Sequence, residues 1–272
     1  MESINKSKKK GMQTHSQIYY HPNPNRELGE RHRNNRVKER CLVYTPPGYN
    51  DEKVGSYPVL YLLHGVGDVE FSWELNGMAS SILDELLREI LIPKIIVIMP
   101  FGFETNEQKY ERIFTPKASF DRYLLGLIRT LETEYKIDVE TTGDNQYKRA
   151  IAGLSMGGKQ ALEFGLEHVD QFSAVGNFSG ALQMRSNADP LPDLLASCRS
   201  KQAQIRKWSL FYHGCGKEDE VHLLIDANRI FVNELKTLGI PHVWHEMEGK
   251  HQWGVWRACL REFLPLLASA WR

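Results

Sequence analysis

The sequence predicts an α/β fold with a mostly parallel central sheet, helices on both of its faces and an antiparallel N-terminal edge. Short apolar runs typical of strands alternate with longer segments in which apolar residues recur at helical spacing. The runs at 58–63 and 95–100 are almost continuously apolar, as in strands that are buried on both faces of a parallel sheet. No repeat or linker divides the chain, so we expect one domain over 17–272 after a flexible tail at 1–16.

The composition is that of a globular chain long enough to bury a large core without disulfides. Of 272 residues, 42% are hydrophobic and 25% are charged. Lys+Arg and Asp+Glu are equal at 34 each, which gives no electrostatic case for nucleic acid or an anionic membrane as a partner. We interpret the excess of basic residues within 1–40 as a solvated tail and loop rather than a binding site.

The N-terminal residues contain no apolar signal-peptide core, and no segment reaches the apolar length of a membrane span. The sequence as given therefore predicts a cytoplasmic protein, or a secreted one if a signal peptide was removed. The chain has four cysteines, at positions 41, 198, 215 and 259. They lack metal-ligand spacing, and we expect free buried thiols. His242 and His245 would lie on opposite faces of a strand, so we expect no metal site and no cofactor.

In the N-terminal half, the sequence predicts strands at 17–20, 37–44, 58–63 and 95–100 and helices at 78–90 and 120–135. The first two strands, separated by a charged loop rich in Pro and Asn, would form the antiparallel edge. The strand at 58–63 ends in a glycine-containing loop at its carboxyl end. Residues 101–118 are polar, aromatic and irregular.

In the C-terminal half, the sequence predicts strands at 150–154, 173–178, 208–214 and 242–247, with helices following at 159–163, 221–238 and 256–267. Residues 180–207 contain Pro190 and Pro192 and are expected to form a long connection. The alternation of strands and helices then continues to the end of the chain.

A Gly-x-Ser-x-Gly pattern centres on Ser155, where an apolar strand turns sharply into a helix. Such a turn holds the serine in a strained conformation that directs Oγ away from the backbone. Gly153 and Gly157 remove the Cβ atoms that would collide there. The alternative is a glycine-rich turn with an incidental serine. We favour a nucleophile, with the N–H of Met156 directed at a developing oxyanion.

Two further polar groups follow the carboxyl ends of later strands, which meet at one edge of a parallel sheet. Glu218 and Asp219 follow the seventh predicted strand, and His251 follows the eighth. The chain order serine, acid, histidine is that of the α/β-hydrolases. Neutral His251 would accept the Ser155 proton, and a carboxylate on its other ring nitrogen would fix the tautomer. We predict Asp219 as that carboxylate, with Glu218 as the alternative.

The second oxyanion donor is expected from the loop after the strand at 58–63, from the N–H of either Val66 or Gly65. His64 directly precedes this glycine turn. It is a conceivable base, but His251 already occupies the position of the base in the chain order. We therefore assign His64 a role in positioning the loop.

With these residues in place, the chain resembles the putative esterase family of α/β-hydrolases, which includes esterase D, enterochelin esterase and carbohydrate esterase family 1 enzymes. It looks most similar to bacterial feruloyl esterases. The resemblance runs from about Val43 to the end and rests on residues 44–49, 57–65, 153–158, 178–180, 214–219 and 251–256. The family's glycine, two residues and aspartate match Gly216 to Asp219, which favours that acid. Two positions depart from the family pattern. Lys250 stands where the family usually has glycine, and Gln252 stands where it often has aspartate.

The resemblance implies a serine carboxylic-ester hydrolase that acts through an acyl-enzyme on feruloyl or related hydroxycinnamoyl esters of plant polysaccharide. Expected substrate-binding residues are Trp73, Phe101, Phe103, Leu182 and Trp253, which lie in or near the loops at the strand ends. Open alternatives are an acetylxylan esterase, an S-formylglutathione hydrolase and an acyltransferase. A non-catalytic binding module is disfavoured, because it would have no reason to retain serine, acid and histidine together. The sequence does not indicate the oligomeric state.

Overall fold

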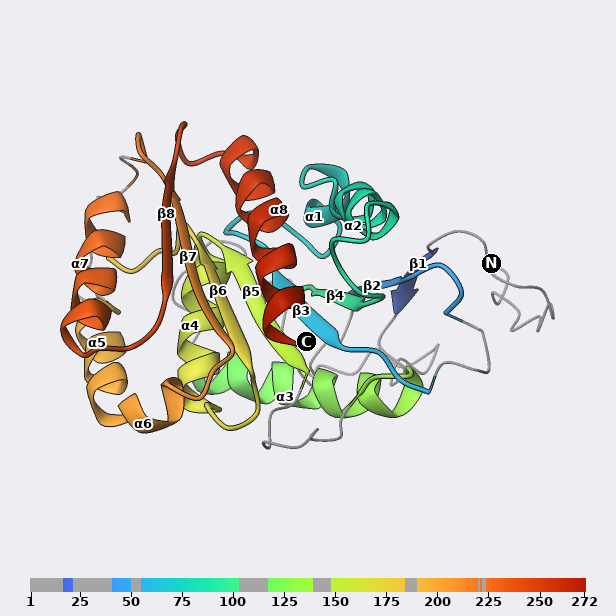
Figure 1. Cartoon of the computed structure of the whole chain (residues 1–272), viewed down its shortest axis with the longest axis horizontal. Coiled ribbons are helices and arrows are strands. Elements are labelled where there is room, and N and C mark those ends of the chain that lie inside the picture. Colours follow the sequence, from blue (N-terminus) through green and yellow to red (C-terminus); the bar gives the residue numbers. More distant parts are fainter. Residues whose placement is uncertain are drawn as a thin grey trace, which may run out of the picture.

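The computed structural model describes residues 17–21, 41–49, 55–102, 117–138, 148–183, 190–219, 221 and 224–272. In this part of the chain, eight strands form one sheet in the order β1-β2-β4-β3-β5-β6-β7-β8 (Figure 1). The strands are β1 (Gln17–His21), β2 (Cys41–Thr45), β3 (Val59–Leu63), β4 (Ile96–Pro100), β5 (Arg149–Leu154), β6 (Ala174–Phe178), β7 (Leu210–Gly216) and β8 (Val243–Met247). Strand β2 pairs antiparallel with β1 and β4, and the remaining pairs are parallel. This is the predicted mostly parallel sheet with its antiparallel edge.

The helices cover both faces of the sheet. They are α1 (Ser72–Leu75), α2 (Ala79–Arg88), α3 (Lys117–Glu134), α4 (Met156–Glu167), α5 (Leu191–Ser200), α6 (Gln202–Ile205), α7 (Leu224–Thr237) and α8 (Trp253–Ala270). Residues of α3 to α7 share one hydrophobic core with one face of the sheet, and residues of α1, α2 and α8 share a second core with the other face (Figure 1). Ligands of such sheets bind beyond the carboxyl ends of the strands, where the connecting loops meet.

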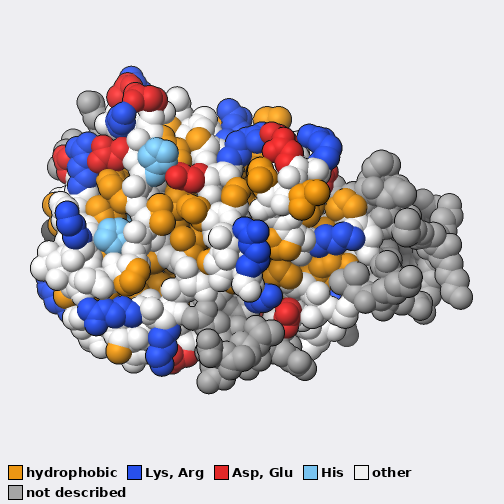
Figure 2. All heavy atoms as spheres, viewed as in Figure 1, with side chains coloured by type: hydrophobic (Ala, Val, Ile, Leu, Met, Phe, Trp, Pro, Cys, Tyr) orange, Lys and Arg blue, Asp and Glu red, His pale blue; other side chains and the backbone are white. Residues whose placement is uncertain are grey.

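The central strands are almost entirely apolar because both of their faces are covered. Every residue of β3, β4 and β5 is buried, as the continuous apolar runs predict. In the edge strand β8, the first four residues are partly or fully exposed, and only the last residue, Met247, is buried. Charged side chains of both signs are dispersed over the face in Figure 2, in keeping with the balanced composition.

Residues 190–207 differ from the irregular connection that the sequence predicts, because they contain α5 and α6. Pro190 is the N-cap of α5 and Pro192 is its second residue. Proline is tolerated in the first turn of a helix, since the missing N–H would have no intrahelical acceptor there. Leu194 and Cys198 then bury one face of α5 in the core. The two prolines therefore mark the start of a helix rather than a break in structure.

Several predicted features lie outside the described residues, among them the tail at 1–16, residues 37–40 of the second predicted strand and residues 103–116. The four cysteines are buried, as predicted, and none forms a disulfide among the described residues. None of the helices that the structure describes is long and apolar enough to cross a membrane.

Candidate active site

Ser155 occupies a strained turn between β5 and α4. Its backbone has φ 52° and ψ −118°, a region that residues other than glycine rarely adopt. A Cβ on Gly153 would lie 2.5 Å from the carbonyl oxygen of Gly157, and a Cβ on Gly157 would lie 2.4 Å from that of His64. Both flanking positions therefore require glycine. The turn has the geometry that the Gly-x-Ser-x-Gly pattern predicts.

Residues at and beyond the end of β6 hold this strained turn in place. The N–H of Ser155 donates to the carbonyl oxygen of Phe178 at 2.9 Å. The carbonyl oxygen of Ser155 accepts from the N–H of Lys159 at 3.1 Å and from that of Ala181 at 3.0 Å. Such surrounding contacts are what allow a strained backbone conformation to persist.

Ser155, His251 and Asp219 form one continuous hydrogen-bonded chain. His251 Nε2 lies 2.9 Å from Ser155 Oγ, and His251 Nδ1 lies 2.8 Å from Asp219 Oδ2. Asp219 is completely buried and Ser155 is 8% exposed, while the ring of Trp256 packs edge-on against the imidazole at 4.9 Å. A carboxylate that accepts from Nδ1–H leaves Nε2 free to accept the serine proton. The arrangement can therefore activate Oγ as a nucleophile.

The loops that carry the acid and the histidine are joined by backbone hydrogen bonds. The N–H of Lys217 donates to the carbonyl oxygen of Met247 at 2.8 Å. The N–H of Glu218 donates to the carbonyl oxygen of Gly249 at 3.0 Å, while the side chain of Glu218 is exposed to solvent. The structure thus brings Asp219, rather than Glu218, against the imidazole.

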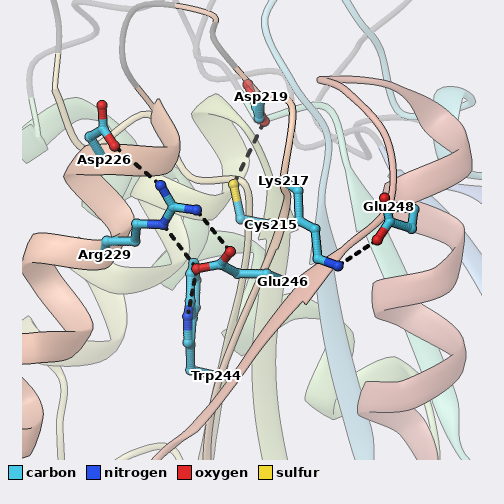
Figure 3. A network of polar contacts seen from close by, with 8 residues as sticks. All are labelled: Cys215, Lys217, Asp219, Asp226, Arg229, Trp244, Glu246 and Glu248. Atoms are coloured by element: carbon cyan, nitrogen blue, oxygen red, sulfur yellow. Dashed lines mark hydrogen bonds and ion pairs between the residues drawn. The ribbon is translucent and has the colours of Figure 1, made fainter.

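Two surface ion pairs lie alongside these loops (Figure 3). The ammonium of Lys217 pairs with the carboxylate of Glu248, which joins the two loops again through their side chains. The guanidinium of Arg229 on α7 forms a fork with both carboxylate oxygens of Glu246 on β8, at 2.9 Å each. Exposed pairs of this kind stabilise a fold only modestly. They align the edges of the site rather than take part in it.

Cys215 lies directly behind the acid, with its Sγ 3.8 Å from Asp219 Oδ2 (Figure 3). Burial, reinforced by the negative charge of Asp219, raises the pKa of the Cys215 thiol to about 12. The thiol is therefore neutral at physiological pH, and it adds no second negative charge beside the carboxylate.

The expected oxyanion donors flank the serine from two sides. Met156 is the first residue of α4, so its N–H belongs to the free N-terminal end of that helix. On the other side, a Cβ on Gly65 would lie 3.5 Å from the Cβ of Ser155. The next residue in this loop, Val66, is 45% exposed. The loop of Gly65 and Val66 therefore lies beside the nucleophile, where the second donor is expected.

His64 is buried at the base of the same loop. One ring nitrogen lies 2.8 Å from the carbonyl oxygen of Gly65, and the other lies 2.5 Å from that of Phe101. The imidazole thus joins the loop after β3 to the end of β4. These contacts fit the predicted positioning role and leave the base position to His251.

The predicted substrate-binding side chains fall into two groups. Trp73, Phe101 and Leu182 are at most 1% exposed and belong to the hydrophobic cores. They support the loops from within and present no surface to a ligand in this structure. Trp253 is partly exposed, and its ring packs edge-on against that of Trp73 at 5.4 Å. Phe103 lies outside the described residues.

The two histidines considered as a metal pair engage separate partners. His242 Nδ1 lies 2.8 Å from the carbonyl oxygen of Ile240, and His245 Nδ1 lies 2.7 Å from Glu262 Oε2. Among the described residues, no group of three or more His, Cys, Asp or Glu side chains is arranged to hold a metal ion.

Gly157→Ala should lower the free energy of unfolding by about 1–3 kcal/mol, because the added methyl group would overlap backbone atoms at the end of β3 and in His64. Urea denaturation measures this change. Gly254→Ala is the matched control, since both glycines are the second residue of a helix, and the nearest atom to a Cβ at 254 is 3.8 Å away. Equal stability of the two variants would show that the turn tolerates a side chain.

Comparison with known proteins identifies the family. A sequence model of the putative esterase family matches residues 36–267. An endo-1,4-β-xylanase/feruloyl esterase of Xylanibacter ruminicola is 32% identical over 232 residues, which is 83% of this chain and 28% of that protein. The chain thus spans less than a third of the length of that relative. An acetyl esterase of Caldicellulosiruptor saccharolyticus is 26% identical over 227 residues, which is 72% of this chain and 78% of that protein.

Among solved structures, a ferulic acid esterase superimposes with a TM-score of 0.72 at 24% identity, covering 94% of this chain and 99% of that one. This similarity establishes a shared fold. Because the family model covers most of the chain and the structure has the corresponding sheet, this chain belongs to the putative esterase family and has the α/β-hydrolase fold.

Proposed function

We propose that this protein hydrolyses carboxylic esters through an acyl-enzyme on Ser155, with His251 as the base and Asp219 as its carboxylate partner. The observation that carries the proposal is the hydrogen-bonded chain of the three side chains, at 2.9 Å and 2.8 Å. Each residue follows the carboxyl end of a different parallel strand, β5, β7 or β8. The strained turn at the serine adds support, because it directs Oγ toward the imidazole.

In the first half-reaction, Ser155 Oγ attacks the ester carbonyl carbon while His251 Nε2 removes its proton. The N–H groups of Met156 and of the Gly65–Val66 loop would stabilise the resulting oxyanion. The tetrahedral intermediate then collapses, the bond to the leaving alcohol breaks, and the imidazolium donates its proton to that oxygen. In the second half-reaction, His251 deprotonates a water molecule that attacks the acyl group, and the released Oγ regains a proton.

We further propose that the acyl group is feruloyl or a related hydroxycinnamoyl, released from plant cell-wall polysaccharide. The support is the 32% identity to a protein described as an endo-1,4-β-xylanase/feruloyl esterase. Exposed apolar side chains in the segment that follows β3 fit a flat aromatic acyl group, since Val66 and Phe71 are 45% and 38% exposed. Acetyl esters are the second candidate, on the 26% identity to an acetyl esterase.

Methyl ferulate should have a kcat/KM at least about tenfold higher than an aliphatic methyl ester, which corresponds to about 1.4 kcal/mol of additional transition-state binding. The reason is that only the aromatic acyl group can bury its ring against apolar walls. Steady-state hydrolysis of methyl ferulate, methyl butyrate and p-nitrophenyl acetate measures the preference. Equal values, or a clear preference for acetyl, would reassign the protein as an acetyl or general carboxylesterase and leave the proposed triad in place.

A further inference from the structure

A cluster of buried polar side chains lies beside the nucleophile turn, separate from the proposed triad. It consists of Asn177 on β6, His213 on β7 and Asn228 on α7, each at most 1% exposed. None of the three belongs to a sequence motif, and none has a part in the reaction steps above. Burying an amide costs free energy unless its hydrogen bonds are made. The hydrogen bonds of this cluster therefore indicate which neighbouring groups it keeps in place.

The hydrogen-bond directions within the cluster follow from its surroundings. Asn228 Nδ2 faces two backbone carbonyl oxygens, those of Gly180 at 2.9 Å and Leu224 at 2.8 Å. Both of its hydrogens are thereby used, and Asn228 Oδ1 must accept. It accepts from Asn177 Nδ2 at 2.7 Å. The orientation of the Asn228 amide is therefore fixed at both of its ends.

His213 completes the cluster as a neutral acceptor. Asn177 Nδ2 also lies 3.2 Å from His213 Nδ1, which must carry a lone pair to accept this second hydrogen. The ring proton then resides on Nε2. Burial lowers the pKa of His213 well below its usual value, and the nearby His242 adds to this effect. The cluster therefore keeps one protonation state across the physiological pH range.

One peptide unit connects this cluster to the nucleophile. The carbonyl of the Gly180–Ala181 peptide accepts from Asn228, and the N–H of the same peptide donates to the carbonyl oxygen of Ser155 at 3.0 Å. A Cβ on Gly180 would lie 2.1 Å from Asn177 Oδ1, so the amide of Asn177 packs directly on this glycine. Any rotation of the peptide would therefore break contacts on both of its sides.

Asn228 is also placed to align the acid. It lies in the first turns of α7 and bonds the carbonyl oxygen of Leu224, the first residue of that helix. The next N–H, that of Ile225, donates to the carbonyl oxygen of Asp219 at 3.3 Å. The side chain of Asn228 thus connects the start of α7, the helix that follows Asp219, with the Gly180–Ala181 peptide that binds the backbone of Ser155.

We propose that Asn228 is a positioning residue, which holds the Gly180–Ala181 peptide and, through it, the backbone of Ser155 in register with the imidazole of His251. This inference rests on the proposed function of Ser155. A purely structural role would require only that α7 is packed against the sheet. The two roles differ in what happens to the reactivity of the serine in protein that remains folded.

The test uses Asn228→Ser. A serine hydroxyl in a helix reaches the carbonyl oxygen four residues earlier, here that of Leu224, but is too short to reach Gly180. The variant therefore retains the contact within α7 and loses the contacts to the Gly180–Ala181 peptide and to Asn177. We expect about a 10–100-fold fall in kcat and in the rate of fluorophosphonate labelling, because misplacement of a reacting group by about 1 Å can cost about 100-fold. KM should change little.

Val232→Ala is the matched control. Val232 lies one turn later on the same helix, is 5% exposed, and has no part in the cluster. Thermal unfolding of each variant sets an assay temperature at which all are folded. In Asn228→Ser, the acidic limb of the pH–rate profile should stay in place, because the His251–Asp219 pair is intact. Asn228→Leu, which removes both donors, should lower kcat at least as far.

Wild-type labelling and kcat in folded Asn228→Ser would overturn the proposal, as would equal losses in Val232→Ala. If Asn228→Leu does not fold, Asn228→Ser alone decides, since it keeps the contact within α7. Ser155→Ala, assayed in parallel, separates failure of this inference from failure of the proposed function. If Ser155→Ala is no longer labelled while Asn228→Ser is labelled at the wild-type rate, only the positioning role is contradicted. If Ser155→Ala is still labelled, the assignment of the nucleophile is contradicted.

Discussion

Replacing Ser155 by alanine, or His251 by alanine, should lower kcat for ester hydrolysis by about 10⁴-fold or more while the protein stays folded. In the proposed mechanism the serine supplies the atom that bonds to the acyl carbon, and the histidine is the only base within hydrogen-bond distance of Oγ among the described residues. Both side chains retain some exposed surface at the sheet edge, 8% for Ser155 and 15% for His251. Neither side chain belongs to the two hydrophobic cores, so we expect both variants to fold.

The double variant should be no slower than the slower single variant, because the two residues act as one unit. Steady-state kinetics of the three variants measure this, and circular dichroism verifies that each is folded. Val232→Ala serves again as a control for a small change in stability. Most of the wild-type activity remaining in either single variant would rule out the proposed triad.

Asp219→Asn should lower kcat by about 10⁴-fold, whereas Glu218→Gln should leave it nearly unchanged. The carboxylate of Asp219 accepts a hydrogen bond from Nδ1–H of His251 at 2.8 Å. An amide rotated to donate to this nitrogen would favour the tautomer that carries its proton on Nε2, and Nε2–H cannot accept the proton of Ser155. Glu218 engages the histidine loop through its backbone N–H, and its side chain is exposed.

The two variants are well matched, since they make the same chemical change at adjacent positions. Kinetics measured over a range of pH with one substrate compare them directly. A larger loss of kcat in Glu218→Gln than in Asp219→Asn would show that the proposed triad contains the wrong carboxylate.

Much of this fold could be predicted because the central strands are buried on both faces and therefore read as continuous apolar runs. The serine turn was predictable for a different reason. It has no room for side chains two residues before and two residues after the serine, so glycine stands at both of these positions. Chain order then indicated the acid and the histidine. The spacing from Gly216 to Asp219 already favoured Asp219 over Glu218. The structure adds that Asp219 is buried against the imidazole, while the side chain of Glu218 is exposed.

Other features could not be predicted from patterns. Residues 180–207 were predicted to form a long connection, yet Pro190 and Pro192 lie at the start of α5, where a proline is tolerated. Trp73 was predicted to line a pocket, but an aromatic residue that packs beneath a loop has the same sequence signature as one that lines it. The Asn177–Asn228 contact joins positions 51 residues apart that share no motif, and only the fold brings them together.

The central claim is that Ser155 Oγ is the atom that becomes acylated. Mass spectrometry of the protein after reaction with a fluorophosphonate, followed by peptide mapping, tests it most directly. We predict one phosphonyl group per chain, carried by Ser155, and no labelling of Ser155→Ala under the same conditions. A phosphonyl group on another residue, or undiminished labelling of Ser155→Ala, would contradict the assignment.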